Sequence, residues 1–233
     1  MPLLAYFVHL YTASGAVWSL LALLAVVRHE YRGALLWLLV ATFVDATDGW
    51  LARRARVDLH ARLIIGARLD DIVDYLSYVF VPVFLLLDAG CLPPGLPGLL
   101  VAAAILLASA LGFSRQDAKT ADYYFTGFPS YWNIAALYAL VIQPPPAVNA
   151  IALTVLSVLV FVPIRYVYPS RTPTLWPVTV VFSAIWSLQV ALMIWWLGEV
   201  PGWLFWSSLA FPIYYLALSF WLNAGRAPQV PSA

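Results

Sequence analysis

The feature that most constrains this chain is a series of long apolar runs separated by short proline- and glycine-rich joints. A helix needs about 20 mostly apolar residues to cross the hydrocarbon core of a bilayer. Runs of this kind lie near 5–27, 34–55, 67–88, 96–113, 130–143, 147–167, 174–197 and 201–223. Proline and glycine end helices at the joints, such as CLPPGLPG at 91–98. The sequence therefore predicts an all-α integral membrane protein, a bundle of about eight transmembrane helices. The fifth run is short, which leaves open whether it crosses fully.

Composition supports the membrane assignment and excludes other classes. The chain is 64% hydrophobic and only 10% charged, whereas soluble domains carry about 25% charged residues. A net charge of +1 offers no general basic surface for nucleic acid. The single cysteine, Cys91, excludes an internal disulfide and a cysteine-based metal cluster. The N-terminus has no basic region followed by a cleavage site, so the first run is expected to be retained. We expect residues 1–233 to form one transmembrane domain.

The positive charges predict the orientation. Of the 12 Lys and Arg residues, Arg28 and Arg32 alone fall on one side of the predicted bundle. The others fall on the opposite side, at positions 53, 54, 56, 62, 68, 115, 119, 165, 171 and 226. The positive-inside rule then places both termini and the charged face in the cytoplasm. Arg54, Arg56 and Arg62 are expected mainly to set this topology and to contact anionic lipid.

Acidic residues gather in an unexpected place, at the ends of two apolar runs. The segment 45–74 contains Asp45, Asp48, Asp58, Asp70, Asp71 and Asp74. A carboxylate at the centre of a membrane helix costs about 2.5–3.5 kcal/mol, so such residues usually face a cavity or a partner. Asp45 and Asp48 share one helix face, as do Asp70 and Asp74.

The two runs are consecutive and antiparallel, so these four carboxylates can converge and bind hard divalent cations. Asp58 and Asp71 are expected to be solvated or paired with arginines. A simple set of helix-end charges would leave the pairing, the nearby glycines and the arginine unexplained.

The same stretch carries a specific motif. Asp45-x-x-Asp48-Gly49-x-x-Ala52-Arg53, followed by Gly66-x-x-x-Asp70-x-x-x-Asp74, resembles the signature of the CDP-alcohol phosphotransferase family. The interval between Arg53 and Gly66 is longer than in most of its members. In this respect the chain is similar to the bacterial phosphatidylcholine synthase branch, as it is in GFSRQDAKTADYYFTGFPSYWN at 112–133 and FVPIRYVYPSRT at 161–172. The number of predicted spans also fits this branch.

The resemblance implies an activity and its residues. A bacterial inner-membrane enzyme of this kind transfers the phosphatidyl group of CDP-diacylglycerol to choline, which gives phosphatidylcholine and CMP. The resemblance implies two Mn²⁺ or Mg²⁺ ions per site, held by Asp45, Asp48, Asp70 and Asp74, with Asp74 also the general base. Gly49, Ala52, Arg53 and Gly66 match positions that line the nucleotide. Dimers are common in this family, which leaves a homodimer open.

Elementary chemistry agrees with these roles. A two-metal clamp neutralises a pyrophosphate, and a neighbouring carboxylate can take a hydroxyl proton. Arg53 can grip phosphate oxygens in a fork, and Arg115 and Lys119 are further candidates for phosphate binding. Aromatic faces bind quaternary ammonium ions. The candidate choline residues are Tyr123, Tyr124, Tyr131 and Trp132, with Phe125 between the pairs.

Most other rings are expected to pack or to anchor the interface, as for Trp195 and Trp196. His9, His29 and His60 have no ligand-like spacing. Thr12 resembles a first-span position that contacts the nucleotide, but the asparagine usual nearby is absent.

Other functions stay open at this stage. A related enzyme could use glycerol phosphate, inositol phosphate or serine, although an anionic acceptor needs an additional basic cluster. A small cation transporter would usually carry internal repeats and broken helices at mid-membrane, and neither is evident. A purely structural membrane protein would leave the carboxylates unexplained.

Overall fold

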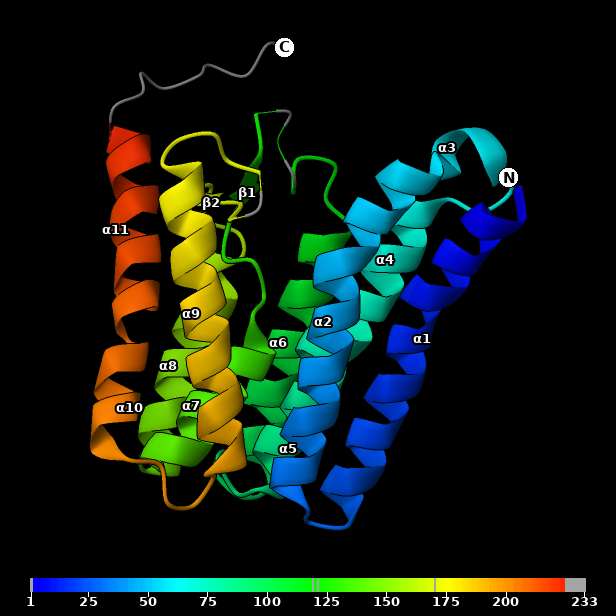
Figure 1. Ribbon diagram of the computed structural model, residues 1–233. Coiled ribbons are helices and arrows are strands. Elements are labelled where there is room, and N and C mark those ends of the chain that lie inside the picture. Colours follow the sequence, from blue (N-terminus) through cyan, green and yellow to red (C-terminus); the bar gives the residue numbers. More distant parts are fainter. Residues whose placement is uncertain (1, 119, 121, 170, 225–233) are drawn as a thin grey trace.

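Helices run up and down through the molecule in the computed structural model, which describes residues 2–118, 120, 122–169 and 171–224 (Figure 1). The helices are α1 (Pro2–Val27), α2 (Tyr31–Ala55), α3 (Val57–His60), α4 (Gly66–Asp74), the π-helix η1 (Tyr75–Phe80), α5 (Val81–Asp88), α6 (Leu96–Phe113), α7 (Trp132–Ile142), α8 (Pro146–Leu159), α9 (Trp176–Trp195), α10 (Gly202–Ser208) and α11 (Ala210–Ala224). Two short strands complete the described fold, β1 (Tyr124–Thr126) and β2 (Arg165–Val167).

The lengths of the helices confirm an all-α polytopic membrane protein. Within the described residues, 5 helical stretches are long and apolar enough to span: 3–27, 31–55, 96–113, 176–195 and 202–224. A sixth stretch, α4–η1–α5, is helical without interruption from 66 to 88. Leu20, Leu107 and Trp221 are more than half exposed. A soluble protein rarely exposes so much apolar surface, so these outward faces suit contact with lipid.

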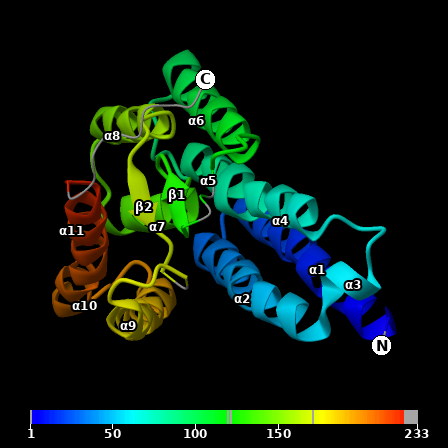
Figure 2. The same cartoon turned by 90° about the horizontal axis from the view of Figure 1, so that it is seen from above.

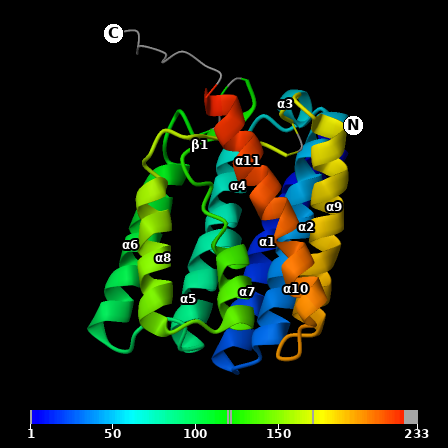
Figure 3. The same ribbon diagram turned by 90° about the vertical axis from the view of Figure 1, so that its left-hand side faces the viewer.

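Two helices are too short to cross a bilayer. α7 has 11 residues and α8 has 14, which at 1.5 Å per residue gives lengths of about 17 and 21 Å. The hydrocarbon core is about 30 Å thick. Both helices fill the lower part of the bundle, and the chain between β1 and α7 descends into it from above (Figures 1 and 3). The short fifth run therefore does not cross the membrane as a helix.

Prolines explain where the helices depart from the expected runs. The predicted run 147–167 is wrong at its end, because α8 stops at Leu159. Pro163 has no N–H and disfavours helix in the residue before it. Pro82 likewise cannot donate to the carbonyl of Tyr78, and the helix widens into η1 just before it. Pro212 leaves the carbonyl of Ser208 without its helical donor, and α10 ends there.

The small β1–β2 sheet was not expected from the sequence. The strands are antiparallel, with Phe125 opposite Tyr166. α11 covers the other edge of β2: Asn223 Nδ2 donates to the carbonyl oxygen of Arg165 at 2.7 Å, and the N–H of Val167 donates to Ser219 Oγ at 3.1 Å. Seen from above, the sheet lies over α7 near the middle of the bundle (Figure 2). It therefore occupies the space above α7, which is too short to reach that end of the bundle.

Close packing of α1 fixes the position of α2 and α4. Tyr11 and Thr47 share a hydrogen bond of 2.7 Å between their hydroxyl oxygens, which sets the register of α1 against α2. On the side of α4, Gly15 is buried, and a Cβ at this position would collide with Cγ1 of Val73. A bare backbone at Gly15 thus lets α4 approach and aligns its aspartates with those of α2.

Both described ends of the chain lie at one end of the bundle. The start of α1, the end of α11, α3 and the β1–β2 sheet are at the top of Figure 1, and the turn between α1 and α2 is at the bottom. Trp195, expected to be an interface anchor, is 61% exposed near that lower end, with the guanidinium carbon of Arg32 5.8 Å from its ring centroid. The arrangement agrees with the predicted sidedness of the charges.

Candidate active site

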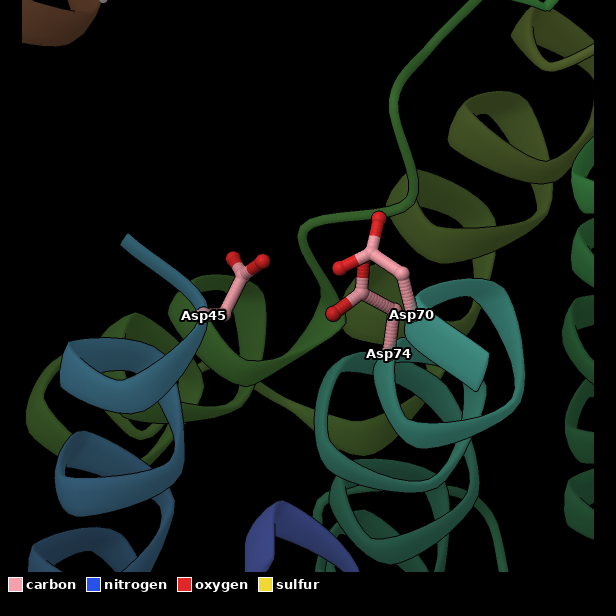
Figure 4. Close-up of side chains that lie close together, drawn as sticks. All are labelled: Asp45, Asp70 and Asp74. Atoms are coloured by element: carbon pink, nitrogen blue, oxygen red, sulfur yellow. The ribbon is translucent and has the colours of Figure 1, made fainter. Parts of the chain in front are cut away.

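Three carboxylates converge between α2 and α4. One carboxylate oxygen from each of Asp45, Asp70 and Asp74 lies within 4.8 Å of the other two. Figure 4 shows Asp70 and Asp74 on successive turns of α4, with Asp45 across from them on α2. The four-residue spacing on α4 and the antiparallel packing of the helices produce this meeting. We call these three residues the acidic centre.

Asp48 is held next to the acidic centre but is not part of it. It is 7% exposed, and its Oδ2 accepts a 2.7 Å hydrogen bond from Thr12 Oγ1. The sequence predicted four converging carboxylates, and the structure brings three of them within bonding range of one ion. Thr12 therefore orients one aspartate of the motif from the first helix.

Tyr78 contacts the acidic centre directly. Its hydroxyl donates to Asp45 Oδ2 at 2.7 Å, a charge-assisted bond that fixes the carboxylate. Tyr78 was not among the residues predicted for the site, although Asp70, Asp74 and Tyr78 follow each other at four-residue intervals and so share one helix face. Its ring centroid lies 6.2 Å from that of Tyr131, so the same side chain joins the acidic centre to an aromatic wall.

A cavity of about 920 Å³ opens on one side of the acidic centre. We call it the arginine cavity, because its walls include Arg53, Arg62 and Arg171. All four small or basic motif residues that were expected to contact a nucleotide line it, namely Gly49, Ala52, Arg53 and Gly66. The structure therefore gathers these predicted residues from α2 and α4 around one space. Arg171 was not predicted as a site residue. Its guanidinium carbon lies 5.7 Å from the ring centroid of Tyr168.

A second cavity, of about 360 Å³, opens on the other side. We call it the aromatic cavity, because rings from several elements line it. They are Tyr78, Phe113, Phe125, Phe128, Tyr131 and Tyr168. The rings of Phe125 and Tyr168 pack with centroids 4.5 Å apart. Among the described residues of its wall, Arg115 is the one cation.

The four motif aspartates are divided between the cavities. Asp45 and Asp70 line both, Asp48 lines only the arginine cavity, and Asp74 lines only the aromatic cavity. The acidic centre therefore lies where the arginine cavity and the aromatic cavity meet. A molecule in each cavity would meet the other at these carboxylates.

Several predicted residues lie elsewhere. Arg115 lines the aromatic cavity instead of the arginine cavity, and its guanidinium donates to both carboxylate oxygens of Asp117, at 2.8 and 2.7 Å. These bonds lower the pKa of Asp117. Lys119 lies outside the described residues. Tyr123 lines the arginine cavity.

Two of the four candidate choline residues are packing residues. Trp132 is fully buried and donates from Nε1 to Ser109 Oγ at 2.7 Å. Tyr124 is 4% exposed and packs with Val167 and Leu218. Neither lines the arginine cavity or the aromatic cavity. Phe113, Phe128 and Tyr168 do line the aromatic cavity, and they were not predicted because their meeting depends on distant segments.

The fold and the site together define a polytopic membrane enzyme with an acidic centre between two cavities. No profile of a known protein family matches the chain. Individual curated proteins, however, are similar to the chain over most of its length. They include "Phosphatidylcholine synthase" of Legionella pneumophila, 43% identical over 72% of this chain and 66% of the relative. The proteins of the same name from Pseudomonas aeruginosa and Rhizobium meliloti are 36% and 33% identical, over 82% and 94% of this chain and 79% and 90% of their own lengths.

This chain therefore belongs to the phosphatidylcholine synthase family.

Proposed function

We propose that this protein transfers the phosphatidyl group of CDP-diacylglycerol to choline, releasing CMP. The observation that carries the proposal is the division of the aspartates between the two cavities. A reaction between a nucleotide-linked lipid and an alcohol needs two binding spaces that share one reactive boundary. The acidic centre supplies that boundary, and Asp74 faces the side on which the alcohol would bind.

The acidic centre fits divalent cations. Its three carboxylates offer oxygen ligands within 4.8 Å of one another, and Mg²⁺ and Mn²⁺ favour oxygen ligands. Asp45, Asp70 and Asp74 would hold the metal, with Asp48 beside them and Tyr78 fixing the carboxylate of Asp45. Such ions supply charge neutralisation for the pyrophosphate and for the leaving phosphate.

The arginine cavity suits the cytidine diphosphate part of the donor. Arg53 can bind phosphate oxygens through two parallel N–H groups, while Gly49 and Ala52 leave the face of α2 open. Arg171 packs against Tyr123 and Tyr168, at 5.8 and 5.7 Å from their ring centroids. These guanidinium groups offer positive charge to the phosphates of an anionic nucleotide, although four aspartates line the same cavity.

The aromatic cavity suits a quaternary ammonium acceptor. Such an ion has no N–H donor, so ring faces and nearby carboxylates are the groups that can bind it. Tyr78, Tyr131, Phe125 and Tyr168 supply the rings. Because Arg115 is held by Asp117, the described walls offer little to an acceptor such as glycerol phosphate or inositol phosphate. The carboxylates and rings of this cavity therefore favour the cationic acceptor choline over an anionic acceptor.

Residues of the chain can account for the proton in the reaction. The choline oxygen forms a bond to the lipid-linked phosphorus as the bond from phosphorus to the CMP oxygen breaks. Asp74 accepts the hydroxyl proton, and CMP leaves as an anion into the arginine cavity. Asp74 is suited to this role because, of the three carboxylates of the acidic centre, it is the one that lines the aromatic cavity and not the arginine cavity.

We place the protein in a bacterial inner membrane with α3, the β1–β2 sheet and both described chain ends on the cytoplasmic side. Arg53, Arg54 and Arg62 lie toward that end, which agrees with the positive-inside rule. CMP would then return to the cytoplasm, where nucleotides are recycled.

A direct assay tests the function. Purified protein in detergent is incubated with CDP-diacylglycerol, labelled choline and Mn²⁺, with and without a chelator. We expect labelled phosphatidylcholine and an equal amount of CMP, both lost when the chelator is added. CMP release with glycerol phosphate, inositol phosphate or serine, but not with choline, would assign another acceptor. No turnover with any alcohol would refute the proposed function and would favour the alternative of a small cation transporter.

A further inference from the structure

We infer that His9 binds the cytidine part of the donor from the first helix, an inference that rests on the proposed function. His9 lies on α1 and lines the arginine cavity. It is only 5% exposed, and within the described part of the chain its Nε2 is buried with no hydrogen-bond partner. A buried polar nitrogen at a cavity wall, with no partner in the protein, is positioned to bond a ligand.

The surroundings hold the His9 ring in place. Gly66 begins α4 beside it, and a Cβ added to Gly66 would lie 3.3 Å from His9 Cε1. A larger residue at 66 would press on the imidazole, so glycine here preserves both the ring position and the opening.

The register of α1 and α2 shows which part of the donor His9 can reach. Thr12 is level with Asp48, because their side chains are bonded. His9 is three residues toward the start of α1, and Asp45 is three residues the other way along the antiparallel α2. At 1.5 Å per residue, His9 is therefore about 9 Å from the level of Asp45 along the helix axes.

This distance separates His9 from the reacting phosphate. With the pyrophosphate at the acidic centre, the cytosine and ribose would extend past Asp48 toward the charged end of the bundle, where His9 lines the arginine cavity. A base or ribose oxygen can accept from Nε2, or a ribose hydroxyl or base amino group can donate to it. His9 does not line the aromatic cavity, so it should not affect choline directly.

The test compares three variants of the full-length protein in detergent. His9→Phe keeps a buried ring and removes its nitrogens, and His9→Gln returns an amide near the position of Nε2. His60→Phe is the matched control, since His60 is exposed on α3 and lines neither cavity. Equilibrium dialysis measures the Kd for labelled CMP with Mn²⁺ present, and steady-state kinetics give kcat and the KM for each substrate.

We expect His9→Phe to raise the Kd for CMP and the KM for CDP-diacylglycerol about tenfold, the effect of losing one ordinary hydrogen bond. The KM for choline and kcat should change less than about twofold, and His9→Gln should recover most of the affinity. The inference is refuted if His9→Phe leaves CMP binding unchanged, if it alters the choline KM equally, or if His9→Gln is as weak as His9→Phe.

The assay also separates this inference from the proposed function. If the wild type binds CMP but makes no phosphatidylcholine, and His9→Phe weakens that binding, the function fails and the nucleotide contact stands. If the wild type is active and His9→Phe binds CMP normally, the contact alone fails. A wild type that binds no CMP would overturn the inference.

Discussion

The hydrogen bond from Tyr78 to Asp45 gives a sharp test of the acidic centre. Tyr78→Phe removes the hydroxyl and keeps the ring, so an aromatic wall for the acceptor remains. The lost bond is 2.7 Å long and ends on a carboxylate. Bonds to charged groups contribute about 1.5–3 kcal/mol, which corresponds to a factor of about 10 to 150 in a binding constant. Loss of groups that orient metal ligands typically weakens metal affinity by about 10- to 100-fold.

We therefore expect Tyr78→Phe to shift the Mn²⁺ titration of activity to concentrations about 10- to 100-fold higher. Much of kcat should return at saturating metal, and the KM for choline should stay close to the wild-type value. Titration calorimetry of Mn²⁺ binding, without substrates, provides an independent readout.

Tyr75→Phe is the matched control, because Tyr75 lies on the same π-helix, donates to the carbonyl of Leu106 at 3.1 Å and lines neither cavity. Equal titrations for Tyr78→Phe and the wild type, or equal shifts in both variants, would refute the reasoning.

Three further tests address the other roles. Asp74→Asn should abolish turnover but keep CMP binding, because an amide cannot accept the proton; near-normal kcat would remove Asp74 as the base. Thr12→Val should raise the KM for CDP-diacylglycerol about tenfold, because it removes the donor that orients buried Asp48; an unchanged KM in the same kinetic assay would exclude this role. Replacing choline by ethanolamine should raise the acceptor KM, because ethanolamine is more strongly hydrated and fits aromatic faces less well; equal use of both alcohols would contradict an aromatic choline site.

Local patterns in the chain were sufficient for much of this description. The apolar runs predicted the long helices, and 96–113 agrees with α6 at both ends. The four-residue spacing of Asp70 and Asp74 predicted a shared face, because helical geometry depends only on neighbours in sequence. Gly49, Ala52, Arg53 and Gly66 were expected at one site and do line one cavity.

The predictions from sequence were wrong or incomplete where a residue's position depends on contacts between segments that are far apart in the chain. Trp132 was a reasonable candidate for binding choline, yet it packs against Ser109 in the core. The pairing of 124–126 with 165–167 joins segments on either side of α7 and α8, and no local period encodes it. A proline could be seen at 163, but not that the following residues would form a strand against α11.

The sequence by itself determined that this is a polytopic membrane protein with paired carboxylates on two consecutive helices, because hydropathy and helical period are properties of short stretches. Only the tertiary structure decided that Asp45 joins Asp70 and Asp74 while Asp48 pairs with Thr12, and that aromatic rings from four parts of the chain enclose the opposite side. These contacts depend on how closely α1 packs on α2 and α4, where a single glycine at position 15 sets the approach. The division of one acidic centre between two cavities is a property of packing, and helix periodicity alone does not specify it.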